Sequence, residues 1–152
     1  MSESTQAQAP YCPECGATKV NGLTCWEMLG ALLAWDYKDA ELRAEHFLTV
    51  ACYNLQHPAQ FSEATLAGLQ AVFIEHLDHG LGIAEIRRRV GKAAAGVARV
   101  LKPESERQPV LRQWPMTIAA VYQPEQPAGA AERVRAWAAA IRRAITLAGM
   151  AR

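Results

Sequence analysis

The stretch CPECGATKVNGLTCWEMLGALL, residues 12–33, joins a short cysteine-containing loop directly to an apolar helical pattern. Thr24 followed three residues later by Glu27 is a capping-box signature, and apolar residues then recur at helical spacing, which predicts a helix over 25–35. The loop before this helix is rich in Pro, Gly, Asn and Lys and is too short and polar to bury a core. Something other than apolar packing must therefore order the loop.

The rest of the chain shows helical patterns and no long alternating pattern typical of strands. Prolines, glycines and charged stretches separate these patterns, which predict helices over 39–57, 62–79, 83–101 and 130–148. The predicted fold class is all-α, a compact bundle of about five helices with an N-terminal zinc-knuckle loop. We expect residues 1–10 to be a disordered tail and residues 11–150 to be a single helical domain, with the zinc knuckle at 11–25.

Composition limits the classes of function. The chain has 152 residues, of which 51% are hydrophobic and 20% charged, as in an ordinary globular domain. A net charge of +1 provides no global field for nucleic acid or acidic membranes. Because the sequence shows no signal-peptide pattern and no apolar run of ~18 residues, we expect a cytoplasmic protein without a membrane partner. That compartment is reducing, so the cysteines are expected as thiols or metal ligands.

The pattern Cys12-Pro-Glu-Cys15-Gly16 is typical of a metal knuckle. Two thiolates at this spacing can hold one tetrahedral ion, and Gly16 permits the left-handed turn behind them. Cys25 in the first turn of the predicted helix adds a third sulfur, where the helix macrodipole favours a thiolate. The spacing favours Zn²⁺ over a redox dithiol, because thioredoxin-like pairs lie at a strand-to-helix junction that this sequence lacks.

Geometry favours His57 as the fourth ligand. If helices 25–35 and 39–57 form a hairpin, His46 and His57 lie on either side of the level of Cys25, about 16 Å apart along the helix. One ion cannot bind both of them. Helical side chains lean toward the N-terminus of their helix, so His57 leans toward Cys25 and His46 leans away. His46 stays the alternative ligand; Cys52 is a further competitor, expected to be a buried core thiol.

Two other functions follow from other residues. His46 and Tyr53, together with His76, predict a pocket for a small ligand or an enzyme site. The simpler interpretation is that these side chains are buried and hydrogen-bonded within the protein. The basic run Arg87–Arg89 predicts a nucleic-acid-binding zinc module, but interleaved acidic residues favour a solvated helix face instead. The sequence thus disfavours nucleic acid as a partner.

With these motifs assembled, the chain resembles a bacterial family of unknown function, the domain-of-unknown-function family 5946. The resemblance covers roughly residues 11–122. It implies that the cysteines and two histidines belong to the family motif, and it implies no activity. The spacer from Cys15 to Cys25 is short for the family, and Cys52 is extra. The matching residues are Cys12-Pro-Glu-Cys15-Gly16, Cys25-Trp26, His46-Phe-Leu-Thr-Val50, Tyr53, Gln56-His57-Pro58, His76 and Trp114-Pro115-Met-Thr117-Ile118.

The sequence therefore predicts a zinc-stabilised helical protein rather than an enzyme. In this hypothesis Cys12, Cys15, Cys25 and His57 close a structural site that pins the N-terminal loop to the first helical hairpin. A site closed by four protein ligands has no open position for water and is not catalytic. The expected partner is another protein or a second copy of the chain.

Overall fold

The computed structural model describes residues 10–94 and 100–150, and within them the chain forms seven α-helices and no strand. This confirms the predicted all-α class. None of these helices is both long and apolar enough to cross a membrane. The helices are α2 (Cys25–Trp35), α3 (Ala40–Ala44), α4 (His46–Leu55), α5 (Glu63–His79), α6 (Ile83–Ala94), α7 (Ile118–Val121) and α8 (Ala130–Met150). Three short 3-10 turns are η1 (Pro58–Gln60), η2 (Glu104–Glu106) and η3 (Pro127–Gly129).

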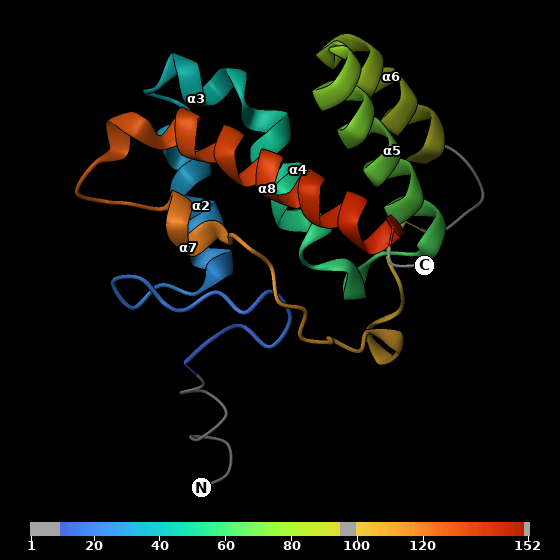
Figure 1. The fold of residues 1–152 in the computed structure, drawn as a ribbon, viewed down its shortest axis with the longest axis horizontal. Coiled ribbons are helices and arrows are strands. Elements are labelled where there is room, and N and C mark those ends of the chain that lie inside the picture. The colour runs from blue at the N-terminus through green and yellow to red at the C-terminus, as the bar shows by residue number, and fades with distance from the viewer. Residues whose placement is uncertain (1–9, 95–99, 151–152) are drawn as a thin grey trace, which may run out of the picture.

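Helix α4 lies at the centre of the arrangement. It packs against α2, α5 and α8, and α8 crosses the molecule beside it (Figure 1). Helices α5 and α6 form a hairpin at one end, whereas α2 and α7 lie together at the other end, above the N-terminal loop (Figure 1). The two ends of α4 are therefore surrounded by different parts of the chain.

Local capping explains several helix boundaries. Thr24 and Glu27 form the predicted capping box, with the Glu27 N–H donating to Thr24 Oγ1 at 3.3 Å and the Thr24 N–H donating to Glu27 Oε1 at 2.9 Å. Ser62 caps α5 by accepting from the Thr65 N–H at 3.3 Å. Gly80 ends α5 in the left-handed conformation, with φ of 70°, which glycine adopts without steric cost.

The predicted helix over 39–57 is wrong in one respect, because the chain breaks at Glu45 into α3 and α4. Glu45 has φ of −100° and ψ of 17°, and its N–H bonds to the Leu42 carbonyl, which tightens the last turn of α3. The Arg43 guanidinium donates to the carbonyls of Asp36 and Tyr37 and ties α3 to the end of α2. Tertiary hydrogen bonds therefore set this break.

The expected disordered tail, residues 1–10, lies outside the described residues except for residue 10. Residues 95–99 of the helix predicted over 83–101 are also outside them. Within the described part, α6 ends at Ala94, and the short helix α7 was not among the predicted helices.

A buried polar link joins the end of α4 to α8. Gln56, the residue after α4, is fully buried, and its Nε2 donates to the Met116 carbonyl at 2.8 Å. Its Oε1 accepts from Nε1 of Trp137, the largest fully buried side chain of α8, at 3.2 Å. Since buried polar groups are costly without partners, this pair of bonds fixes where α4 ends relative to the core.

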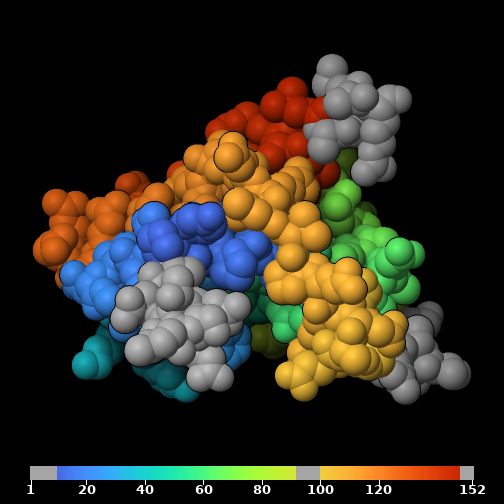
Figure 2. All heavy atoms as spheres, turned by 90° about the horizontal axis from the view of Figure 1, so that it is seen from below, coloured from blue at the N-terminus to red at the C-terminus, as the bar shows by residue number. Residues whose placement is uncertain are grey.

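The N-terminal loop is held against the segment that precedes α7. Figure 2 shows residues 10–20 beside the segment 100–120 on one face of the molecule. The Arg112 N–H donates to the Glu14 carbonyl at 3.1 Å, and a Cβ placed on Gly16 would lie 3.5 Å from Leu111 Cδ1. The loop is therefore covered from outside by residues more than ninety positions later in the sequence.

Candidate metal centre

Four side chains from three segments meet below α2. They are Cys12 and Cys15 of the N-terminal loop, Cys25 of α2 and His57 after α4, and one ligand atom from each lies within 4.8 Å of all the others. His57 Nε2 is 3.7 Å from Cys12 Sγ and 3.4 Å from Cys25 Sγ. These four residues could hold a metal ion.

The loop from Cys12 to Gly16 folds as a tight turn. The Gly16 N–H donates to the Cys12 carbonyl at 3.0 Å, and Gly16 takes a left-handed φ of 80°. A Cβ strains the chain in this region, so glycine suits the position. A second turn at Asn21 and Gly22, both with positive φ, returns the chain to the start of α2. The two turns bring Cys15 and Cys25 together although they are ten positions apart in the sequence.

Each remaining ligand is placed by the end of a helix. Cys25 is the first residue of α2, directly after the Thr24 cap, where the positive end of the helix dipole favours a thiolate. His57 lies just beyond α4, and Pro58 follows it as the first residue of η1. The residue before a proline leaves the helical conformation, so the His57 side chain departs from the helix axis and reaches the cysteines.

Hydrogen bonds orient the imidazole. His57 Nδ1 lies 2.7 Å from the Tyr53 carbonyl oxygen, which can only accept, so Nδ1 carries the proton. This leaves Nε2, the atom beside the sulfurs, free to bind a metal. Metal-binding histidines usually donate their other ring N–H in this way, which fixes both the tautomer and the ring orientation.

Backbone N–H groups point at the sulfurs. The N–H groups of Glu14 and Cys15 lie 3.4 and 3.5 Å from Cys12 Sγ, and the Ala17 N–H lies 3.4 Å from Cys15 Sγ. Donors placed at sulfur stabilise the thiolate form, which is the form that binds metals.

Without an ion, crowding of these groups shifts their pKa values. The hydrogen bond with Cys15, followed by the bond with Cys25, lowers the pKa of the Cys12 thiol, and the same contact with Cys12 raises the pKa of Cys15. Burial opposes the charged form of His57, but hydrogen bonds with Cys12 and Cys25 raise its pKa to about 10. The three thiols cannot all ionise in this space unless a cation balances their charge.

Tyr53 belongs to this centre, which the sequence analysis did not predict. Its ring stacks on the His57 ring with centroids 4.0 Å apart, and its hydroxyl lies 3.8 Å from Cys25 Sγ. The Trp26 ring also lies near Tyr53, at a tilt, with the two ring centroids 6.0 Å apart. The spacing of four residues between Tyr53 and His57 places them on one helix face, but it did not distinguish a site from a core contact.

Glu14, between the two loop cysteines, is a second residue that the sequence analysis missed. It is buried, and its Oε2 accepts from the Ala59 N–H of η1 at 2.7 Å. The carboxylate therefore joins the knuckle to the turn that follows His57.

The structure separates the two competitors from the centre. His46 begins α4 and bonds through Nδ1 to Asp36 Oδ2 at 2.7 Å, at the end of α4 opposite His57. Cys52 is fully buried in the core, and burial raises the pKa of its thiol. Neither residue is part of the four-residue group.

The three residues of the predicted ligand pocket do not share one pocket. His46 lines a cavity, but Tyr53 faces Cys25, and the His76 Nδ1 bonds to the Leu81 carbonyl at 2.7 Å. The prediction treated one stripe of α4 as one environment. In the structure the two parts of this short helix have different neighbours. The C-terminal end of α4 lies beside α2 and the N-terminal loop, whereas its middle lies beside α5 and α6.

The basic run of α6 is largely ion-paired. Arg88 bonds to Glu85, and Arg89 bonds to Glu75 at 2.6 Å and to Glu85 at 3.2 Å. These pairs break up the continuous positive stripe that a nucleic-acid-binding surface needs.

A comparison with protein families identifies one match, a family of unknown function (DUF5946), over residues 10–146. Neither a curated protein nor a solved structure gives a significant match. Any functional conclusion therefore depends on the chain's own residues.

Proposed function

The chain belongs to the DUF5946 family, and we propose that this member is a zinc-stabilised protein-interaction module with a structural Zn²⁺ site formed by Cys12, Cys15, Cys25 and His57. The observation that carries the proposal is the convergence of these four ligand atoms within 4.8 Å from three separate segments. An ion at their centre ties the N-terminal loop to α2 and to the end of α4.

The donor set favours zinc. Three thiolates and one imidazole in tetrahedral reach suit Zn²⁺, whereas Mg²⁺ and Ca²⁺ prefer oxygen ligands. Bonds of ~2.3 Å to sulfur and ~2.0 Å to nitrogen give a sulfur-to-nitrogen edge of about 3.5 Å in a tetrahedron. The separations of 3.7 and 3.4 Å between His57 Nε2 and two of the sulfurs agree with that edge.

A structural role is favoured over a catalytic one. Four protein ligands complete a tetrahedral shell, and catalytic zinc sites keep one position for water or substrate. Cys15, Cys25 and His57 are buried, and the Tyr53 ring covers the imidazole. The nearest carboxylate along the loop, Glu14, is bonded to the Ala59 N–H and serves to link segments.

Metal analysis of purified variants tests the site. We expect one zinc per chain in the wild type and less than about a tenth of an equivalent in Cys12→Ser, because a three-ligand site binds far more weakly. Cys52→Ala is the matched control, since it also removes one cysteine sulfur, from outside the four-residue group, and should keep its zinc. Wild-type protein without zinc, or equal loss in both variants, contradicts the proposal.

The interaction role is supported by large exposed apolar side chains, one next to a ligand and one in the segment that covers the loop. Trp26, next to Cys25, is 67% exposed, and Val110, in the segment that covers the loop, is 73% exposed. Exposed aromatic and aliphatic residues held on a rigid base are typical of protein interfaces. A second copy of the chain is the first partner to test.

Analytical ultracentrifugation measures this self-association. We expect Trp26→Gln to weaken it, while Tyr37→Gln leaves it unchanged, because Tyr37 is 84% exposed but lies beyond the opposite end of α2. A wild type that stays monomeric over the accessible concentration range excludes the homo-oligomer. Equal effects of the two substitutions exclude this surface.

A further inference from the structure

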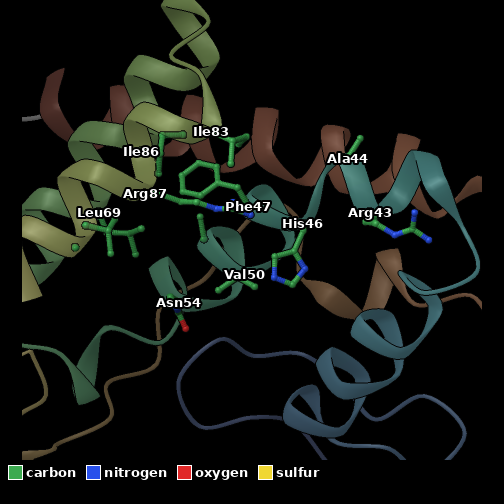
Figure 3. Close-up of a pocket in the computed structure, with 13 residues that line it drawn as sticks. Arg43, Ala44, His46, Phe47, Val50, Asn54, Leu69, Ile83, Ile86 and Arg87 are labelled. Carbon is green, nitrogen blue, oxygen red and sulfur yellow. The ribbon is translucent and has the colours of Figure 1, made fainter.

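A pocket of about 550 Å³ lies between α4 and the α5–α6 hairpin, apart from the metal centre. This volume falls within the range of ~300–1,000 Å³ that small-molecule sites occupy. Its walls are mainly apolar and include Phe47 and Val50 of α4, Leu69 of α5 and Ile86 of α6 (Figure 3). None of the residues that line it is acidic.

Arg87 gives this pocket a free positive charge. In the run of three arginines, Arg88 and Arg89 are neutralised by Glu85 and Glu75. Arg87 lines the pocket and forms no ion pair or hydrogen bond with any residue that the structure describes. Figure 3 shows its side chain reaching from α6 toward Phe47 on α4. An unpaired guanidinium above an apolar wall is suited to a carboxylate ligand.

His46 adds an oriented polar group on the α4 side. Its Nδ1 is held 2.7 Å from Oδ2 of Asp36, a buried carboxylate, while the imidazole itself remains 56% exposed. This bond fixes the ring and leaves Nε2 as its one unused polar atom. The break between α3 and α4 makes the contact, because it places His46 at the start of α4 opposite Asp36.

From these observations we propose that the pocket binds a small amphipathic monocarboxylate. Its apolar body lies between Phe47, Val50 and Leu69, and its carboxylate pairs with the guanidinium of Arg87. Arg43 also lines the pocket, but its guanidinium donates to the carbonyls of Asp36 and Tyr37. Arg87 is therefore the arginine that is left to pair with one carboxylate. This site does not depend on the zinc proposal, since it shares no residue with the metal centre.

Calorimetric titration of decanoate into the full chain tests the site. We expect saturable binding of one decanoate per chain, and 1-decanol should bind at least about ten-fold more weakly because it lacks the charge. Arg87→Gln should weaken decanoate binding about ten-fold. Arg88→Gln is the matched control on the same helix and should leave the affinity within about two-fold, since exposed ion pairs contribute little. Absence of saturable decanoate binding overturns the proposal, as do equal affinity for decanol and equal effects of the two arginine substitutions.

A blocking substitution tests the location. Val50→Trp fills the pocket from α4 and should abolish decanoate binding while the far-ultraviolet circular dichroism stays that of the wild type. If this variant does not fold, Leu69→Trp makes the same test from α5, because Leu69 is only half-buried. A folded blocking variant that binds decanoate like the wild type overturns the proposal.

Discussion

Replacing His57 by alanine is the sharpest test of the metal centre, because the chain contains a matched histidine that should behave differently. His57 and His46 lie at opposite ends of α4. Only His57 has a ring nitrogen beside the cysteine sulfurs, at 3.4 Å from Cys25 Sγ. His46 is bonded to Asp36 instead.

The expected loss of zinc affinity follows from dividing the metal's binding free energy among its four ligands. Structural zinc sites bind with ~10–16 kcal/mol, so one of four ligands accounts for about 3 kcal/mol. His57→Ala should therefore weaken zinc binding by roughly 100-fold or more. Because binding to the folded chain is linked to folding, the same ~3 kcal/mol should lower the midpoint of thermal unfolding by roughly 6–12 °C.

Two measurements separate a ligand from a structural residue. Competition with a chromophoric chelator gives the zinc affinity, and thermal unfolding with and without excess chelator gives the contribution of the metal to stability. In His57→Ala the chelator should change the unfolding midpoint much less than in the wild type. In His46→Ala the zinc affinity should equal that of the wild type, although loss of the bond to Asp36 lowers stability slightly.

The reasoning is refuted if His57→Ala keeps wild-type zinc affinity. It is also refuted if His46→Ala loses zinc to the same extent, because His46 makes no contact with the four-residue group.

Three further predictions address the centre and the fold. Acidification from neutral pH should release zinc, because the metal-bound thiolates have depressed pKa values and the stability they provide is lost as pH falls. The absorbance of a zinc-binding dye measures the released metal, and retention of zinc in strong acid contradicts the prediction. Gln56→Ala should cost about 2–3 kcal/mol in chemical denaturation, because Trp137 Nε1 and the Met116 carbonyl lose their buried partner; an unchanged midpoint rules out that role. Gly22→Ala should cost about 1 kcal/mol by the same assay, from φ of 76° alone, since no atom lies within 4 Å of the added Cβ.

Helix positions that are encoded locally could be predicted from the sequence. The Thr24 capping box gave α2 its observed bounds, and Ser62 and Gly80 marked the ends of α5. The break at Glu45 could not be predicted, because no proline or glycine lies nearby. It depends on hydrogen bonds from α3 and α4 back to Asp36 and Tyr37, which exist only after the helices pack.

In the candidate site, too, features encoded locally in the sequence could be predicted, and features that depend on packing could not. The knuckle spacing identified Cys12 and Cys15, and the direction of helical side chains selected His57 over His46, as in the group that the structure assembles. The roles of Tyr53 and Arg87 could be recognised only from the tertiary structure. Tyr53 faces the cysteines only because α2 packs beside α4, and Arg87 faces a pocket because α6 folds back along α5.

The N-terminal loop has little apolar burial of its own, which is the physical reason for proposing an ion beside it. From residue 11 to residue 24, only Glu14, Cys15 and Ala17 are buried, so apolar burial is small. Ordering each residue of such a segment costs about 1–2 kcal/mol, more than these contacts return. The remaining ties converge on Glu14, which accepts the Ala59 N–H through its carboxylate and the Arg112 N–H through its carbonyl. Since Glu14 lies between two of the ligands, an ion that fixes Cys12 and Cys15 also fixes η1 and the segment covering the loop.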